Sequence, residues 1–427
     1  MKFYIETYGC QMNVADSELI AAILTEAGHK EANQIEDADL LLFNTCSVRA
    51  HAENRVLGRI RSESSRKKDN PNLKIGVVGC MAQRIGKELI DNYLTMDFVV
   101  GVDQYANLPD IIEKCIKENY WLDFDEKQIY KGIQPTYQNA YSAFVTIMRG
   151  CNNFCSYCIV PYVRGRERSR PWQDIVEETI LAGKQGRKDI TLLGQNVNSY
   201  NDNEMKFPGL LTKLNKLDEI YRLRFITSHP KDLSDELIEV LSTSANVCEH
   251  IHLPLQSGSD KILKAMNRKY TAMYYLDLIH KLHKAIPNIA ITTDIMTGFP
   301  DETDSDFQDT IDVMKQVGFD DVFCYKFSPR PGTAAASMKN QVSESEGLNR
   351  LQRMIDLQRN ISLQKNKAKI GKKVEVYVEN YSKKSVDIVS GKTRDFKVAV
   401  LPGTESDFGT LKTVEVKDAT ASTLICF

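Results

Sequence analysis

The sequence lacks the features that would place it in a membrane or direct it to export. It contains no run of about 18 apolar residues, so no transmembrane helix is expected. Its first residues, 1–6, have neither a long apolar core nor a small-residue cleavage site, which argues against a secretory signal. Glycine (23) and proline (13) are too scarce for a low-complexity or collagen-like chain. We therefore expect a globular, cytoplasmic protein without a membrane partner.

An excess of charge of one sign is also missing. The chain has 55 Lys and Arg against 57 Asp and Glu, a net charge of −2, which argues against a strongly basic nucleic-acid binder. Only the C-terminal end of the chain is basic, with 11 Lys and Arg against 8 Asp and Glu in residues 367–427. That surplus indicates either a nucleic-acid contact or ordinary solvated surface.

Residues 1–120 alternate between apolar runs and amphipathic stretches. The pattern predicts strands at 2–8, 40–44, 74–78 and 98–100, and helices at 16–26, 49–61, 84–93 and 107–116. Such alternation is typical of a doubly wound α/β domain with a parallel sheet. Residues 121–140 are polar and aromatic without a clear period, and we interpret them as a linker.

The pattern restarts in residues 141–366. Six strands are predicted, at 143–148, 190–193, 222–226, 250–253, 290–295 and 321–327, with helices at 172–184, 234–243, 272–285 and 304–317. Six units fall short of the eight of a closed TIM barrel, so we expect a partial (β/α)6 barrel. A charged helix over 344–368 leads into residues 367–427, whose short strands at 374–378, 385–389, 396–400 and 413–419 predict a small all-β barrel.

Ten cysteines need an explanation, because disulfides do not persist in a reducing compartment and clustered thiols there are more often metal ligands. Cys151, Cys155 and Cys158 follow the spacing C-x3-C-x2-C, directly after the first predicted strand of the central region. Thiolate loops of this kind hold iron–sulfur clusters, and three ligands for four irons leave one iron open to a small molecule. A zinc loop completed by a remote fourth ligand is the alternative.

A second group of cysteines is spread along the first 80 residues. Cys10, Cys46 and Cys80 each stand just past the end of a predicted parallel strand, so the three thiols should meet at one sheet edge. Gly9 and Gly79 would allow the close turns that such loops need. The trio indicates either a second three-thiolate cluster or three buried free cysteines. Structural roles are expected for the other four, Cys115, Cys248, Cys324 and Cys426.

The first cysteine motif, at the start of a six-unit partial barrel, resembles the radical S-adenosylmethionine (SAM) superfamily. The whole chain resembles its methylthiotransferases, most closely the branch that modifies N6-isopentenyladenosine (N6-dimethylallyladenosine) in tRNA. The resemblance is carried by residues 7–13 (TYGCQMN), 44–50 (NTCSVRA), 52–55 (AENR) and 79–83 (GCMAQ). Sibling enzymes that act on threonylcarbamoyl-adenosine or on a ribosomal protein, and an RNA-binding iron–sulfur sensor without turnover, remain as alternatives.

The resemblance implies two [4Fe-4S] clusters, SAM and a catalytic role for all six clustered cysteines. It implies that one SAM supplies the methyl group, that a second yields a 5′-deoxyadenosyl radical, and that a methylthio group reaches C2 of the adenine beside the anticodon of tRNA. An electron donor of flavodoxin or ferredoxin type and a monomeric state are also expected. Family analogy places Tyr157 near the SAM adenine, and it suggests SAM contacts for Gln195, Gln256, Ser257 and Asp294, which follow or end predicted barrel strands.

Basic residues suggest where RNA would bind. The segment 164–170 places four arginines close to the cluster loop, of which Arg164 and Arg166 are our candidate RNA contacts, with a solvated surface turn as the alternative. The C-terminal barrel resembles the TRAM domain of RNA-modifying enzymes. That resemblance implies that basic side chains of this barrel contact RNA phosphates. The candidates are Lys372, Lys373, Lys383 and Lys384, with Lys392 and Arg394 beside them.

Overall fold

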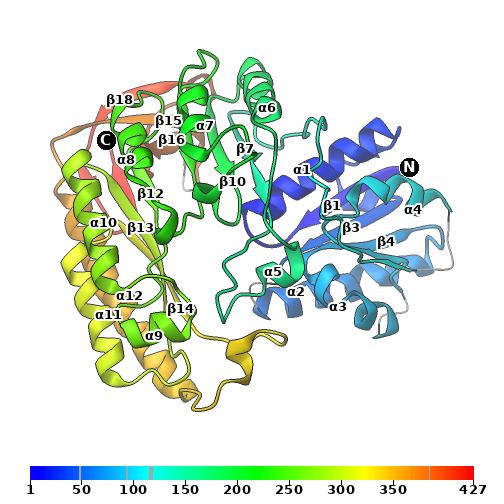
Figure 1. Cartoon of the computed structure of the whole chain (residues 1–427). Coiled ribbons are helices and arrows are strands. Elements are labelled where there is room, and N and C mark those ends of the chain that lie inside the picture. Colours follow the sequence, from blue (N-terminus) through cyan, green and yellow to red (C-terminus); the bar gives the residue numbers. More distant parts are fainter. Residues whose placement is uncertain (48–49, 93–94, 115–118, 384) are drawn as a thin grey trace.

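The computed structural model describes residues 1–47, 50–92, 95–114, 119–383 and 385–427 (Figure 1). It confirms the α/β fold class with three successive regions. Figure 1 shows the N-terminal domain in blue beside the green-to-yellow central domain, and the red C-terminal sheet lies across the central domain from it. No helix in the described residues is long and apolar enough to cross a membrane.

The N-terminal domain is built on a six-stranded parallel sheet in the order β2-β1-β3-β4-β5-β6. Its central strand β3 is buried at all six positions, as expected of a parallel strand that is covered on both faces. The strands are β1 (Lys2–Thr7), β2 (Lys30–Glu31), β3 (Leu40–Thr45), β4 (Lys74–Gly79), β5 (Phe98–Val100) and β6 (Tyr120–Trp121). The helices are α1 (Gln11–Glu26), α2 (Ala50–Ser64), α3 (Cys80–Asn92) and α4 (Leu108–Lys114).

The central domain contains the six predicted barrel strands as two parallel three-stranded sheets, β7-β10-β11 and β12-β13-β14. An isolated bridge between Leu223 and Val247 links the two sheets, so the strands form one open barrel. The strands are β7 (Ser142–Thr146), β10 (Asp189–Leu193), β11 (Arg222–Phe225), β12 (His250–His252), β13 (Ala290–Thr297) and β14 (Asp321–Lys326).

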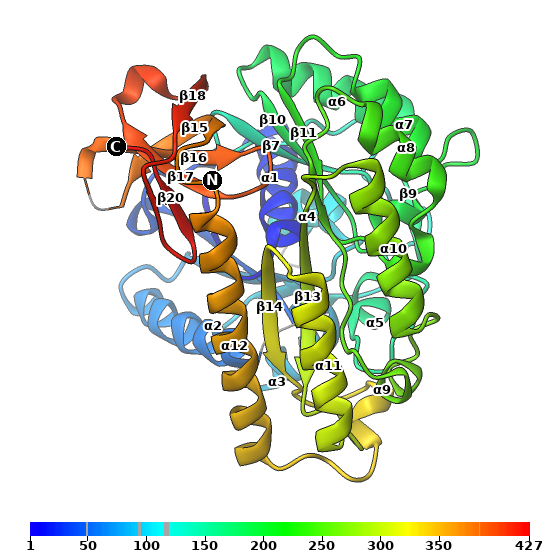
Figure 2. The same cartoon turned by 90° about the vertical axis from the view of Figure 1, so that its left-hand side faces the viewer.

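Helices cover the outside of this barrel, as Figure 2 shows for α10, α11 and α12. Several begin at side-chain caps, such as Ser234, Thr271 and Thr303, whose oxygens accept backbone N–H groups of the first turn. They are α6 (Trp172–Lys184), α7 (Phe207–Leu214), α8 (Asp235–Thr243), α9 (Asp260–Ala265), α10 (Ala272–Ala285), α11 (Asp304–Val317) and α12 (Glu344–Lys367). A short hairpin, β8 (Met148–Arg149) with β9 (Arg168–Ser169), encloses α5 (Val160–Arg164).

The C-terminal region is a curled six-stranded sheet in the order β18-β15-β16-β17-β20-β19. Its strands are β15 (Lys373–Ser382), β16 (Ser385–Thr393), β17 (Val398–Pro402), β18 (Leu411–Glu415), β19 (Asp418–Ala419) and β20 (Thr423–Ile425). It is fastened to the central domain through Arg222 and Arg224 of β11, which are almost fully buried. The Arg224 guanidinium donates to Asp189 and to the carbonyls of Thr393 and Arg394, so this interface is polar.

Residues 121–140 pack against both neighbouring domains. Tyr130 is buried in the core of the N-terminal domain, and its hydroxyl donates to the Val102 carbonyl at 2.7 Å. Tyr137 is buried in the core of the central domain, and its hydroxyl donates to Glu178 at 2.7 Å. The segment therefore joins the two cores instead of spanning open solvent.

Candidate functional site

Cys151, Cys155 and Cys158, here called the local trio, lie on one loop between β8 and α5. The backbone folds tightly there, since the Cys158 N–H donates to the Cys155 carbonyl at 2.9 Å. Gly150 begins the loop with φ +76°, and a Cβ at this position would lie 1.9 Å from the Arg166 carbonyl oxygen. Only glycine fits both the backbone angle and the close approach.

Hydrogen-bond donors are directed at the thiols of the local trio. Asn153 Nδ2 lies 3.5 Å from Cys151 Sγ, and Nη1 of the buried Arg268 lies 3.6 Å from Cys155 Sγ. Burial, followed by the charge of Cys155, raises the pKa of Cys158 to about 12. A metal must therefore displace a proton from Cys158 to bind it, which is the usual coupling between metal binding and thiol ionisation.

Cys10, Cys46 and Cys80, here called the assembled trio, come from three separate strand ends. Cys10 follows β1, Cys46 follows β3 and Cys80 begins α3 directly after β4, and these three strands are neighbours in the parallel sheet. A hydrogen bond with Cys46 is the largest of the effects that lower the pKa of Cys10 to about 6, and the charge of Arg164 adds to it. Its position at a helix N-terminus further favours the thiolate of Cys10, whereas burial raises the pKa of Cys80.

Arg164, the last residue of α5, joins the two trios. Its Nε donates to Cys80 Sγ at 3.2 Å, and its Nη2 donates to Asp16 of α1 at 2.7 Å. Arg164 is only 4% exposed, so our prediction that it contacts RNA is wrong. A buried carboxylate 148 residues away holds this side chain inside the protein.

The donor set fits iron–sulfur clusters. Each trio supplies three thiols, and arginine N–H groups are aimed at a sulfur in both. Hydrogen bonds to sulfur are one way in which proteins tune such clusters. In the parts of the chain that the structure describes, no three Cys, His, Asp or Glu side chains stand in the geometry of a formed metal site. The fit therefore rests on the chemistry of the donors and on their grouping.

The candidate SAM residues occupy the barrel mouth in different ways. The half-buried Tyr157 packs against a cluster that contains Met266 and Phe299. Oε1 of Gln195 is buried without a partner among the described residues. The Gln195 oxygen is thus available to a ligand.

Two further candidates, Gln256 and Asp294, are linked through the backbone. The N–H of Gln256 donates to the Asp294 carbonyl at 2.9 Å, and Gln256 has a φ of +73°. The Asp294 carboxylate pairs with His252 at 3.3 Å. Ser257 differs, because it is fully buried and its hydroxyl already meets Thr310 at 3.3 Å, so it serves the fold.

Of the remaining RNA candidates, Lys384 lies outside the described residues. Lys372, Lys373 and Lys383 are exposed. The exposed Arg166 stacks its guanidinium 4.4 Å from the ring centre of Phe154. Arg394 is instead occupied, because its Nε donates to Glu249 at 2.7 Å across the interface with the central domain.

Of the four cysteines expected to be structural, Cys248 and Cys426 are buried and Cys324 is half-buried. Cys115 lies outside the described residues. Burial raises the pKa of Cys248 to about 11, which keeps that thiol protonated near neutral pH.

A groove of about 470 Å³ is lined by residues that lie near both trios in the chain. Gln83 and Arg84 line it from the first turn of α3, which begins at Cys80, and Ile159, the neighbour of Cys158, lines it from the other side. Tyr162 of α5, which is 51% exposed, adds an aromatic wall. A ligand in this groove would lie close to the loops that carry both sets of thiols.

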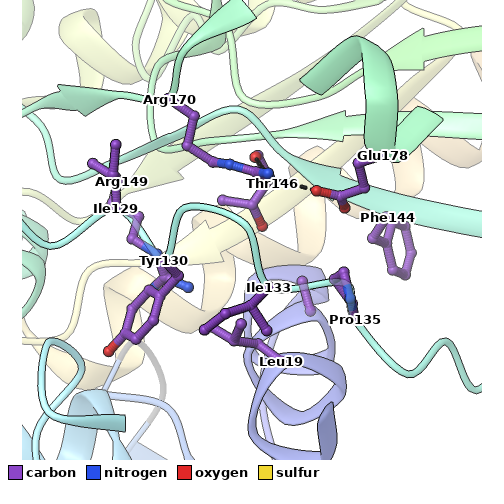
Figure 3. A pocket seen from close by; sticks show the side chains of 11 residues that line it. Leu19, Ile129, Tyr130, Ile133, Pro135, Phe144, Thr146, Arg149, Arg170 and Glu178 are labelled. Atoms are coloured by element: carbon purple, nitrogen blue, oxygen red, sulfur yellow. Dashed lines mark hydrogen bonds and ion pairs between the residues drawn. The ribbon is translucent and has the colours of Figure 1, made fainter. Parts of the chain in front are cut away.

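A second, much smaller cavity of about 20 Å³ lies between α1 and the 121–140 segment (Figure 3). Tyr130, Arg149 and Thr146 line it, and the pair Arg170–Glu178 closes one side at 2.6 Å. The volume suits one water molecule. Such a water would satisfy Nη1 of Arg149, which has no partner among the described residues.

Sequence reasoning missed three residues of this site, Asp16, Arg149 and Arg268. Their partners are distant in the chain, so no short motif contains them. The only sequence signal was at Asp16, an acidic residue next to Ala15. The structure shows that its helix, α1, is buried along most of its length.

Comparison with known proteins agrees with this site. The family model of the radical SAM superfamily matches residues 145–314, and that of uncharacterized protein family UPF0004 matches residues 2–101. A radical S-adenosylmethionine methyltransferase from Kitasatospora setae, solved with cobalamin and a [4Fe-4S] cluster bound, has a TM-score of 0.60 at 14% identity, over 78% of this chain and 77% of that one. That likeness establishes the fold alone.

Curated relatives share far more sequence. The tRNA-2-methylthio-N(6)-dimethylallyladenosine synthase of Thermoanaerobacter sp. (strain X514) is 46% identical over 99% of this chain and 91% of the relative. The protein of that name from Parabacteroides distasonis is 44% identical over 99% of this chain and 94% of the relative. The chain therefore belongs to the family of tRNA-2-methylthio-N(6)-dimethylallyladenosine synthases within the radical SAM superfamily.

Proposed function

We propose that this protein transfers a methylthio group to C2 of the adenine of N6-dimethylallyladenosine beside the anticodon of tRNA. SAM serves both as the methyl donor and as the source of a 5′-deoxyadenosyl radical. The observation that carries the proposal is the presence of two cysteine trios on neighbouring domains, joined by the 3.2 Å contact between Arg164 and Cys80.

The chemistry of the substrate explains why one protein needs both trios. The C2–H of adenine is neither acidic nor electrophilic enough for acid–base or nucleophilic chemistry, so a radical must remove this hydrogen. When bound, the clusters supply the electron that cleaves SAM and an iron-held sulfur for transfer. The local trio would hold the first cluster and the assembled trio the second.

The other residues of the site bind and orient the substrates. Tyr157 forms an aromatic wall for the SAM adenine, and Gln195 and Asp294 offer polar groups beside it. Gln256 shapes the same barrel mouth through its backbone. We infer that the target base enters the groove lined by Ile159 and Tyr162, because its lining comes from α3, which begins at Cys80, and from the segment that directly follows Cys158. Aromatic side chains stack on splayed-out RNA bases in many RNA-binding proteins.

The three regions divide the work. Residues 1–120 hold the second cluster, residues 141–366 bind SAM and the first cluster, and the intervening 121–140 segment joins their cores. Residues 367–427 bind RNA phosphates through exposed lysines such as Lys373 and Lys383. The anticodon stem-loop of tRNA is the proposed RNA partner, a flavodoxin- or ferredoxin-type protein the electron donor, and the cytoplasm the place of action of a monomeric enzyme.

The test uses anaerobically reconstituted full-length protein with SAM, a reductant and a stem-loop RNA that carries N6-dimethylallyladenosine. Mass spectrometry of digested RNA should show 2-methylthio-N6-dimethylallyladenosine, and liquid chromatography should show 5′-deoxyadenosine. The same stem-loop with unmodified adenosine is the matched control and should give much less product. Cleavage of SAM without any methylthio product on either RNA would contradict the proposed function.

A further inference from the structure

Asp16 on α1 forms a buried charged cluster with two arginines of the central domain. Its Oδ1 accepts from Arg149 Nη2 at 2.8 Å, and its Oδ2 accepts from Arg164 Nη2 at 2.7 Å. The Asp16 side chain has no exposed surface, and each arginine side chain is 4% exposed. We call these three residues the Asp16 clamp.

The two arginines of the clamp stand at opposite ends of the loop that carries the local trio. Arg149 ends β8, two residues before Cys151, and Arg164 ends α5, six residues after Cys158. One carboxylate of the N-terminal domain therefore holds both ends of the loop. Asp16 itself lies on the helix that begins directly after Cys10 of the assembled trio.

The clamp also reaches a sulfur of the assembled trio, through the 3.2 Å contact from Arg164 Nε to Cys80 Sγ. A continuous set of hydrogen bonds thus runs from the ends of one cysteine loop to a thiol of the other trio. Since side chains in packed interiors have little freedom, such a set fixes how the two trios lie relative to each other.

The charge of the clamp is unbalanced. Two arginines face one aspartate, and the other group bonded to the carboxylate is the neutral Tyr105 hydroxyl, 3.5 Å from Asp16 Oδ2. Nη1 of Arg164 has no partner among the described residues. A buried cation without full compensation favours an anion nearby, and a set of thiolates beside Cys80 would be that anion.

We propose that the Asp16 clamp is a positioning element that couples the two trios. It holds the SAM-cleaving loop at a fixed separation from the sulfur-donating site, and its Arg164 N–H tunes that site. This proposal rests on the proposed function, since it concerns transfer between the two sites. Loss of the clamp should therefore uncouple the reactions, with SAM still cleaved but less methylthio product formed for each 5′-deoxyadenosine.

The main experiment compares Asp16→Asn with Asp189→Asn in the full-length reconstituted protein. Asp189 is the matched control, because it is also a buried aspartate paired with a buried arginine, Arg224 at 3.1 Å, but this pair belongs to the interface with the C-terminal sheet. We measure the ratio of methylthio product to 5′-deoxyadenosine. It should fall about tenfold or more in Asp16→Asn, as misplacement of reacting groups predicts, and stay within about twofold in Asp189→Asn.

A second readout needs no turnover. In protein that lacks Cys151, Cys155 and Cys158, electron paramagnetic resonance can follow the midpoint potential of the cluster at the assembled trio. Arg164→Gln should lower this potential, because it removes a positive charge and an N–H···S donor. Asp189→Asn should leave it unchanged.

Each outcome decides the proposal. Unchanged product ratios in both Asp16→Asn and Arg164→Lys overturn it, and so does an equal fall in Asp189→Asn. If Asp16→Asn does not fold, Arg164→Lys decides alone, because it keeps the charge but loses the Nε contact. If the protein without substitutions cleaves SAM but makes no methylthio product, the proposed function fails. In that case an unchanged midpoint potential in Arg164→Gln would still refute the role of the clamp.

Discussion

The local and the assembled trio carry the same number of thiols but depend on the chain in different ways. The local trio is complete within residues 151–158, so a single loop sets its spacing. The assembled trio depends on the register of three strands, in which Thr7 pairs with Asn44 and Thr45 with Gly79. It also depends on the packing of two domains, because Arg164 arrives from the central domain.

Because the two trios depend on different parts of the chain, they should be lost through different kinds of damage. Damage to one loop removes the local trio and leaves the N-terminal sheet intact. Damage to the N-terminal sheet should remove the assembled trio and leave the loop able to bind its cluster. The predictions below test this independence, beginning with the largest expected effect.

Cys155→Ala should abolish SAM cleavage, because two thiols are too few to hold the cluster of the local trio. Formation of 5′-deoxyadenosine under reducing conditions is the measurement. Cys324→Ala is the control, since Cys324 lies in β14 outside both trios, and it should cleave SAM normally. Native cleavage by Cys155→Ala would refute the assignment of the local trio.

Joint replacement of Cys10, Cys46 and Cys80 by alanine should separate the two sites. Bound iron should fall from about eight to about four atoms per chain, at four per cluster. SAM cleavage should persist while methylthio product disappears, as measured by iron analysis and nucleoside mass spectrometry. Loss of all iron, or of none, would show that the trios are not independent.

A glycine directly precedes the first cysteine of each trio, and its replacement tests the packing at that site. Gly150→Ala should destabilise the protein by about 2–4 kcal/mol, because φ is +76° and the added Cβ would meet the Arg166 carbonyl. Gly9→Ala should act similarly at the assembled trio, where the Cβ would lie 2.6 Å from Cys46 Cβ. Gly132→Ala, with φ +77° and no heavy atom within 4 Å, should cost only about 1 kcal/mol. Chemical unfolding measures all three, and equal losses would contradict the steric argument.

Glu18 provides a test at the junction between α1 and the 121–140 segment. Burial is the main effect that raises the pKa of this carboxyl from 4.5 to about 7, although the Gln138 N–H donates to it. The folded state therefore holds the proton more tightly than the unfolded state, and stability should fall as pH rises from about 4.5 to 7, by up to about 3 kcal/mol. Glu18→Gln should remove this part of the pH dependence in unfolding experiments. An unaltered pH profile would refute it.

The smallest expected effect concerns the C-terminal sheet, which lies away from both trios. Replacing the exposed Lys372, Lys373 and Lys383 by alanine should weaken tRNA binding and leave SAM cleavage unchanged. For each lysine that binds a phosphate, its removal should make the slope of log affinity against log salt shallower by about 0.7–0.9. An unchanged slope would show that these lysines do not bind RNA. Substitution is preferable to truncation, because removal of the sheet would strip the buried Arg224 of its carbonyl partners.

Long amphipathic elements were predictable from the sequence. The helices at 172–184, 272–285 and 304–317 match α6, α10 and α11 residue for residue, because their apolar faces repeat over several turns. Several short elements were not predictable, although the apolar run at 98–100 did predict β5. The two-residue strands β2 and β6, the three-residue β20 and the one-turn helices α5 and α9 contain too few residues for a period.

The grouping of the six cysteines in two trios was also predictable, but each trio was predicted for a different reason. The local trio is a motif, whereas the assembled trio followed from the rule that parallel strands end at one sheet edge. The role of Arg164 was not predictable, because its charge suggested a surface position. Its burial depends on Asp16 and Cys80, which only the folded chain brings to it.

The most direct test of the account is mass spectrometry of tRNA nucleosides from cells with and without the gene for this protein. When the gene is present, tRNA should contain 2-methylthio-N6-dimethylallyladenosine. Without the gene, N6-dimethylallyladenosine should accumulate in its place, and a copy with Cys10, Cys46 and Cys80 replaced should not restore the methylthio group. An unchanged level of the methylthio nucleoside without the gene would contradict the account.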